Sequence, residues 1–246
     1  MKLEDLVREL RTAFGATLRT VVVYGPAASG EAVRRADLHV LVVVDELPLA
    51  RLEDAGAQVV AWSDAGFPPP LILTNAEWRS SADVFPMEYA ELLEHHRVLH
   101  GELPREGVQV DPEELRLAVE REAMGTLLQL RRAVLASGSD VKRRAELLGA
   151  SFGSVLALLR GALRAQGVRP SMDPGEIVSE AAFRAGLEAA PLHRVLGHWR
   201  GTEQVTETEV DDVLDGYMSD IAVLVAHLDR LVPVRAGESG ARPPTR

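Results

Sequence analysis

Residues 18–45, LRTVVVYGPAASGEAVRRADLHVLVVVD, decide the fold of the N-terminal half of the chain. They contain two runs, residues 20–24 and 38–44, that are too continuously apolar for strands with one face in solvent. We therefore expect two strands that are buried on both faces. The residues between them are small or helix-compatible, which predicts a tight turn into a short helix whose N-terminus suits a phosphate.

This stretch resembles the nucleotidyltransferases of the DNA polymerase beta superfamily, in the branch of small bacterial and antibiotic-modifying enzymes. In that family a strand ends in Gly-Ser, a short helix carries Gly-Glu, and Asp-x-Asp opens the next apolar strand. Here the three parts read Gly25-Pro26, Gly30-Glu31 and Asp37-Leu38-His39. The order and spacing match, but Pro26 stands in place of the serine and His39 in place of the second aspartate.

The resemblance implies transfer of a nucleoside monophosphate from an NTP to a hydroxyl acceptor, with a divalent metal, Mg²⁺ or Mn²⁺, as cofactor. It assigns the metal to Asp37 and His39. It assigns the nucleotide phosphates to Gly25, Pro26, Ser29 and Gly30. Residues 37 and 39 are two apart on a strand, so their side chains leave the same face and can share one metal site.

The two departures weaken this site. His39 replaces a carboxylate with an imidazole, so we expect manganese or zinc to bind in preference to magnesium. Pro26 has neither the hydroxyl nor the backbone N–H that a Gly-Ser turn can direct at a phosphate oxygen. The sequence therefore predicts a nucleotidyltransferase-like protein whose catalysis is impaired.

The resembled family has a third carboxylate on a later strand beside the first pair, where it binds metal or accepts a proton. Glu88, within a strand expected over residues 86–92, is the candidate, and Asp83 and Glu91 are its rivals. His95, His96 and His100 could suggest a metal site. However, His96 and His100 would align only on a helix, and residues 97–99 look extended, so we expect surface or structural roles for the three histidines.

Composition narrows the classes of function. The chain has 246 residues, 46% of them hydrophobic, no cysteine and a formal net charge of −10. The lack of cysteine excludes disulfides and thiolate metal sites. The negative charge argues against nucleic-acid binding, which needs many Lys and Arg contacts to phosphate, and favours a small nucleotide as ligand. The start of the chain has no signal-peptide pattern and residues 147–159 are too short a run to span a membrane, so we expect a cytoplasmic protein.

Helical and strand patterns alternate in the first part of the chain. Helices are expected over residues 3–14 and 47–65, a strand over 71–74, and a helix over 76–82 capped by Asn75. With the strands already described, this order predicts an α/β (α+β) domain of the nucleotidyltransferase type, a mixed sheet packed against helices, over residues 1–104.

The strand signal ends near residue 104, and residues 111–232 read as a bundle of four or five helices. Asp111 and Pro112 open a long first helix. The later helices are expected over residues 140–166, 175–190, 192–200 and from a start signal at 206–209 to 231. The last segment, 235–246, is rich in Gly, Pro and charge and is expected to be disordered.

Three classes of function fit these patterns. The first is an active nucleotidyltransferase. The second is a relative that binds a nucleotide or a protein without turnover. The third is an interaction protein whose helical bundle forms a homodimer or pairs with a protein partner, as in toxin and antitoxin pairs.

Overall fold

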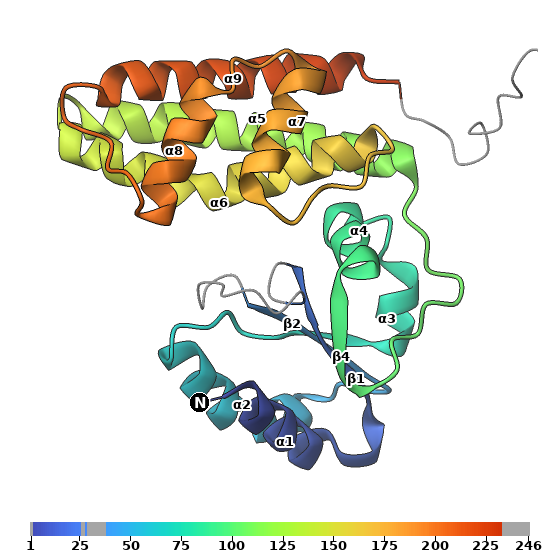
Figure 1. Cartoon of the computed structure of the whole chain (residues 1–246). Coiled ribbons are helices and arrows are strands. Elements are labelled where there is room, and N and C mark those ends of the chain that lie inside the picture. Colours follow the sequence, from blue (N-terminus) through green and yellow to red (C-terminus); the bar gives the residue numbers. More distant parts are fainter. Residues whose placement is uncertain (1, 26–27, 29–37, 233–246) are drawn as a thin grey trace, which may run out of the picture. The chain divides into compact units, whose positions relative to one another are not determined.

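The computed structural model describes residues 2–25, 28 and 38–232. The chain forms two compact units, the first ending at Val110 and the second beginning at Asp111. The first unit combines a sheet with helices, and the described part of the second contains helices alone (Figure 1). This arrangement confirms the predicted fold class. The segment expected to be disordered, 235–246, lies outside the described residues.

In the described residues, the sheet of the first unit has four strands in the order β3-β2-β1-β4. β1 is antiparallel to both β2 and β4, whereas β2 and β3 run parallel. Their bounds are Leu18–Tyr24 for β1, His39–Val44 for β2, Leu71–Thr74 for β3 and His96–Gly101 for β4. The sheet is therefore mixed, and the two apolar runs form its central pair.

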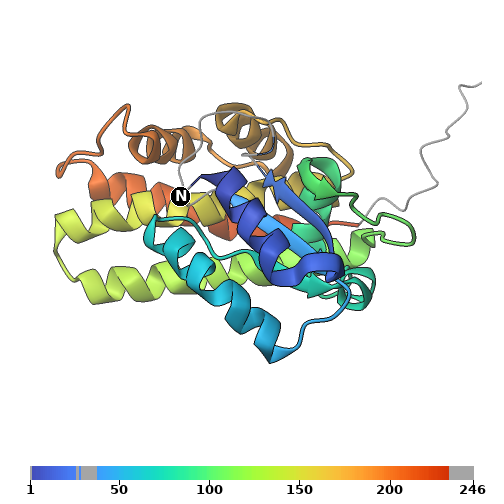
Figure 2. The ribbon, with the colours of Figure 1, turned by 90° about the horizontal axis from the view of Figure 1, so that it is seen from below.

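Helices pack on both faces of the sheet, which explains why residues 21–23 of β1 and 40–44 of β2 are all apolar. Val21 and Val23 of β1 pack toward α1 and α2, and Val22 packs toward α3 and α4 on the other face. α1 and α2 lie side by side along the sheet (Figure 2). The bounds of these helices are Leu3–Phe14 for α1, Leu49–Asp64 for α2, Asn75–Ser80 for α3 and Pro86–Glu94 for α4.

The strand expected over residues 86–92 is wrong, because this segment is helix α4. Pro86 occupies the first turn of the helix, where its missing N–H costs nothing. Pro86, Tyr89 and Ala90 are buried, and their spacing of three and four residues follows a helix rather than a strand. In this region, the strand that pairs with β1 is β4, which begins only at His96.

The cap expected at Asn75 is also wrong, by one residue. Thr74 caps α3: its Oγ1 accepts a hydrogen bond from the Glu77 backbone N at 3.2 Å, and Glu77 Oε2 accepts one from the Thr74 N at 2.7 Å. This reciprocal pair satisfies two backbone donors at the start of the helix. Asn75 is already the first helical residue.

The segment after β4 packs against the first unit. Leu103 and Val108 are 8% and 6% exposed and join the cluster around Trp78. The Trp78 Nε1 donates a hydrogen bond to the Pro104 carbonyl at 2.6 Å. The core of this unit therefore extends beyond residue 104, the boundary expected from the sequence.

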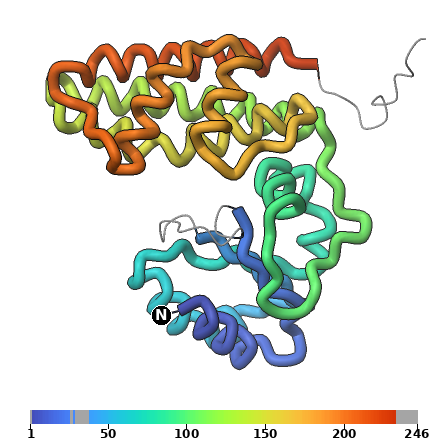
Figure 3. The backbone as a smooth tube through the Cα atoms, in the orientation of Figure 1, coloured from blue at the N-terminus to red at the C-terminus, as the bar shows by residue number. Residues whose placement is uncertain are grey.

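The second unit is a bundle in which α5, α6 and α9 run alongside one another, with α7 and α8 packed against α6 (Figure 3). Their bounds are Pro112–Ser137 for α5, Val141–Ala165 for α6, Pro174–Ala185 for α7, Ala190–Arg200 for α8 and Val210–Arg230 for α9. α5 and α6 are capped by Asp111 and Asp140, whose carboxylates accept backbone N–H bonds.

The helix expected over residues 175–190 ends early, at Ala185. Gly186 adopts a left-handed conformation that closes α7, and Ala189 also has a positive φ of 64°. The buried Asp220 on α9 holds this connection, because its Oδ1 accepts a hydrogen bond from the Glu188 N at 2.8 Å. Burial raises the pKa of Asp220.

α6 is the one described helix long and apolar enough, by length and composition alone, to cross a membrane. However, 56% of its most apolar window is buried inside the protein. That degree of burial is typical of the central helix of a bundle.

We predict that a fragment of residues 1–110 unfolds cooperatively and that a fragment of residues 1–104 is less stable. The shorter fragment loses Val108, and full burial of a valine contributes about 1.5 to 3 kcal/mol. Urea unfolding of both fragments measures the difference. Equal midpoints would show that the segment from 105 to 110 is not part of the first unit.

The three tyrosines of the chain give a second prediction. Burial is the main cause that raises the pKa of Tyr24 and Tyr89 to about 12, and it also raises the pKa of Tyr217. An acid whose pKa is raised by folding stabilises the folded state below its unfolded pKa, about 10, and this contribution is lost as the pH rises through about 12. We expect phenolate absorbance of the folded protein to stay flat past pH 10. Titration near pH 10 before unfolding would contradict the burial.

Candidate functional site

One end of the sheet brings together residues from three strands. The antiparallel register pairs Tyr24, the last residue of β1, with His39 at the start of β2. On the other side it pairs Tyr24 with His96 at the start of β4. The rings of Tyr24 and His39 lie 5.6 Å apart between centroids. We call this place, with Gly25 and helix α4, the sheet-end site.

Gly25 leaves β1 in a conformation that favours glycine, with φ at 72°. Its backbone N donates a hydrogen bond to the His95 carbonyl at 3.1 Å. A Cβ placed on Gly25 would lie 3.9 Å from both Glu91 Oε1 and His39 Cδ2. The carboxylate of Glu91 and the imidazole of His39 therefore reach the same space beside Gly25.

Helix α4 contributes two carboxylates to the sheet-end site. Glu88 and Glu91 are three residues apart and so lie on the same face of the helix. Glu88 is exposed, whereas Glu91 is half-buried. The hydrogen bond between Gly25 and His95 fixes the end of this helix against the end of β1.

The pKa of Tyr24 depends on its burial and on the charges of both carboxylates. Its burial first, and then the charges of Glu88 and Glu91, raise the pKa of Tyr24 to about 12. The phenol therefore stays protonated at neutral pH and keeps a hydroxyl that can donate a hydrogen bond. Asp83, the other rival to Glu88, raises the pKa of Tyr89 instead.

The predicted site residues separate into two groups. Gly25, His39 and Glu88 are described, and the structure places all three at the sheet end. Glu88 lies on a helix, not on the strand expected from the sequence, because residues 86–94 form α4. The other predicted residues lie outside the described residues: Pro26, Ser29, Gly30 and Asp37.

Two described side chains at the sheet end are candidates for holding a divalent cation. Among residues 2–25, 28 and 38–232, no three His, Asp or Glu side chains form a metal-binding group. His39 and Glu91 provide one imidazole and one carboxylate beside the same glycine. A magnesium-like ion bound with a nucleotide takes only one or two protein carboxylates, because phosphate oxygens and water supply the rest. The one carboxylate beside Gly25 is within that number.

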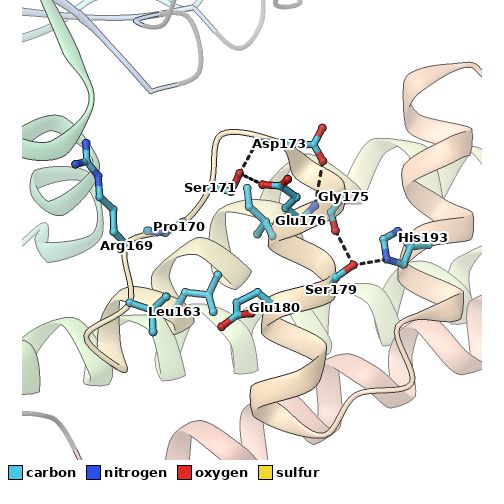
Figure 4. A pocket seen from close by; sticks show the side chains of 12 residues that line it. Leu163, Arg169, Pro170, Ser171, Asp173, Gly175, Glu176, Ser179, Glu180 and His193 are labelled. Carbon is cyan, nitrogen blue, oxygen red and sulfur yellow. Dashed lines mark hydrogen bonds between the residues drawn. The ribbon is translucent and has the colours of Figure 1, made fainter.

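The second unit carries a cavity of about 660 Å³ that sequence reasoning missed. It lies between the end of α6, the loop that follows, and the exposed face of α7, with one side chain from α8 (Figure 4). Leu163, Pro170 and Ile177 give it an apolar part. Its polar residues are Arg169, Ser171, Asp173, Glu176, Ser179, Glu180 and His193.

Hydrogen bonds hold the polar side of this cavity in place. Ser171 Oγ donates to Glu176 Oε2 at 2.5 Å, and Ser179 Oγ lies 3.1 Å from His193 Nε2. Asp173 accepts the Glu176 N–H at 3.0 Å and pairs with Arg200 at 3.1 Å. The backbone hydrogen bond from Glu176, and then Arg200, lower the pKa of Asp173, so its carboxylate is ionised at neutral pH and pairs with Arg200.

Different signals could have revealed the missed residues. Glu91 was a rival to Glu88, and the helical spacing of buried residues in α4 would have placed it on the same face. The cavity has no comparable signal, because its polar residues come from three elements spread over residues 169–193. Only their packing brings them together.

No protein-family model and no curated protein matches the sequence. Among solved structures, the chain is similar to the spectinomycin adenyltransferase AAD(9) from Enterococcus faecialis, determined with ATP and spectinomycin. The sequence identity is 14% and the TM-score is 0.59, over 92% of this chain and 98% of the other. At that identity the likeness concerns the fold, and it extends over both units. The chain therefore has the fold of a nucleotidyltransferase, a mixed-sheet unit followed by a helical one.

Proposed function

We propose that this protein binds a nucleoside triphosphate at the sheet-end site and transfers its nucleoside monophosphate to a hydroxyl acceptor with little turnover. The observation that carries the proposal is the convergence of Gly25, His39 and Glu91 at one end of β1 and β2. The sequence motif begins at this end of the sheet with Gly25 and ends there with His39. The fold shared with an adenyltransferase that was determined with ATP supports a nucleotide as the ligand.

The residues at the sheet end have separate roles in this proposal. Gly25 has a positive φ and no side chain, so its backbone would let a phosphate approach closely. His39 and one carboxylate of α4 would hold the divalent ion beside Gly25. When bound, that ion neutralises charge on the transferred phosphoryl group and on the leaving pyrophosphate. The protonated Tyr24 offers a hydrogen-bond donor beside them.

Weak turnover follows from the two departures in the motif. Charge neutralisation at a transferring phosphate contributes several kcal/mol, and each 1.4 kcal/mol is about tenfold in rate. An imidazole at position 39 in place of a carboxylate weakens this neutralisation of charge. Pro26 removes a hydroxyl and a backbone N–H from the phosphate turn. Binding of the nucleotide tolerates these losses better than the chemical step does.

The cavity in the helical unit suggests a second small-molecule ligand. Two of its carboxylates form ion pairs, Asp173 with Arg200 and Glu180 with Arg184, and Arg169 also lines it. Its serines and carboxylate oxygens would bind a molecule that carries hydroxyl and amino groups, since serine exchanges hydrogen bonds with hydroxyls and carboxylates accept them from ammonium groups. The similar adenyltransferase was determined with spectinomycin. We propose an amino-polyol ligand for this cavity.

We expect ATP to bind in the presence of Mn²⁺ and AMP transfer to remain near background. The double change Pro26→Ser and His39→Asp should strengthen Mg²⁺-dependent ATP binding by about tenfold, because it restores a hard ligand and a phosphate-binding hydroxyl. Calorimetry measures the binding, and label transfer from ATP to a panel of amino-polyols measures turnover. Robust transfer by the unaltered protein would show that His39 serves as a competent ligand.

Two glycines provide a matched control for this experiment. Gly15 and Gly25 both have positive φ, 55° and 72°, so alanine at either position costs about 1 to 2 kcal/mol of stability. Only Gly25 borders the sheet-end site. Gly25→Ala should lose ATP binding, while Gly15→Ala should keep it. Equal loss in both variants would mean that stability, not the site, controls binding.

The cavity gives a separate prediction, with spectinomycin as the probe. Glu180→Gln should weaken its binding about tenfold, the loss expected for one charge-assisted hydrogen bond. The matched control is Glu146→Gln, an exposed acid of α6 that does not line the cavity. If both variants bind spectinomycin as the unaltered protein does, the cavity is not its binding site.

A further inference from the structure

The sheet-end site contains a carboxylate that the sequence motif does not include. Glu91 Oε1 and His39 Cδ2 lie at the same distance, 3.9 Å, from the place where a Gly25 side chain would begin. The two side chains come from different elements, α4 and β2, and meet beside the residue that ends β1. His39 is the position at which the motif departs from two carboxylates.

The proximity of Glu91 and His39 matters because of the charge that each side chain brings to the site. An aspartate at position 39 would bring one negative charge to the site, and the imidazole brings none when neutral. The carboxylate of Glu91 returns one negative charge to the same space. A site with His39 and Glu91 therefore has the charge of the carboxylate site that the motif describes, with one oxygen donor replaced by nitrogen.

We propose that Glu91 supplies the carboxylate that position 39 lacks, so that His39 and Glu91 together hold the divalent cation that accompanies the triphosphate. This inference rests on the proposed function and names the cation-binding pair of the same site. It differs from the motif, which draws both metal ligands from one strand. Here one ligand comes from β2 and the other from α4.

Glu91 fits this role better than Glu88, the residue that the sequence favoured. Both carboxylates act on Tyr24, so both lie on the side of α4 that faces the strand end. Only Glu91 reaches the space beside Gly25, and it is half-buried where Glu88 is exposed. A less solvated carboxylate loses less water when it binds a cation and interacts with the cation more strongly.

The fold holds the pair in place through the backbone. The Gly25 N–H bond to the His95 carbonyl, at 3.1 Å, joins the end of β1 to the residue that follows α4. Glu91 lies one turn before His95, whose own N–H donates to the Glu91 carbonyl at 2.8 Å. The backbone of Glu91 is thus two hydrogen bonds away from Gly25. On the other side, the β1–β2 register fixes His39 opposite Tyr24.

The donor pair also determines which ions bind best. One imidazole and one carboxylate favour Mn²⁺ and Zn²⁺ over Mg²⁺, which prefers oxygen ligands. Triphosphate oxygens and water complete the coordination, so the ion should bind more tightly with ATP than alone.

The test measures Mn²⁺ binding by electron paramagnetic resonance, first with the ion alone and then with ATP. We expect Glu91→Gln and His39→Ala each to weaken Mn²⁺ binding about tenfold or more, the loss typical of a perturbed metal site. Glu88→Gln is the matched control, on the same helix face one turn away, and should change binding by less than about threefold, as expected for a more solvated charge. Thermal unfolding of each variant checks that the fold is retained.

A second comparison tests Glu91→Gln in a variant that should depend less on Glu91. In a His39→Asp background, position 39 again carries a carboxylate, so Glu91→Gln should cost less there than in the unaltered protein. Such non-additivity is the signature of two residues that serve one ion. The expected preference also changes, from Mn²⁺ toward Mg²⁺.

The results separate this inference from the proposed function. If Mn²⁺ binds and depends on Glu91 but ATP does not bind, the cation pair stands and the function fails. If ATP binds with Mn²⁺ and Glu91→Gln has no effect, or Glu88→Gln has the larger one, the inference is overturned. Additive effects of His39→Asp and Glu91→Gln would also overturn it, since independent residues do not couple.

Discussion

The antiparallel pairing of β1 with β2 is the constraint on which the first unit depends. Residues 21–23 of β1 and 40–44 of β2 are buried on both faces, so these runs must be apolar. Their backbone hydrogen bonds must be made with each other and with β3 and β4. This pairing also sets the site. The register that places Val22 opposite Leu41 places Tyr24 opposite His39. A shift of one residue would turn every side chain to the wrong face.

Helix α4 shows how a packing element also carries chemistry. Its buried side holds Tyr89, whose ring stacks on Trp78 at 4.5 Å and whose hydroxyl donates to the Trp78 carbonyl at 2.8 Å. Its other side turns Glu88 and Glu91 toward Tyr24. The aromatic packing fixes the rotation of the helix about its axis, and that rotation decides which carboxylate reaches Gly25. Stability and site geometry therefore have the same source here.

The helical unit also combines stability with the geometry of a cavity, but it does so at the end of a helix. α6 is buried among the other helices, and its apolar length serves the core. The cavity opens where this helix ends and the chain turns into α7, so its polar side is built from a loop, a cap and an exposed helix face. Asp173 both caps α7 and lines the cavity. Residues at such an end can vary in charge without loss of the core.

The sequence by itself determined the two central strands, the change to helices in the second unit and the fold class, because each rests on periodic burial that local residues express. It also pointed to Gly25 and His39, which are fixed by a strand end and a strand start. It misread residues 86–92 and therefore placed Glu88 on a strand. Only the tertiary structure brought Glu91 to Gly25 and gathered the cavity residues of the helical unit. Such meetings depend on the rotation and packing of whole helices, which no local pattern encodes.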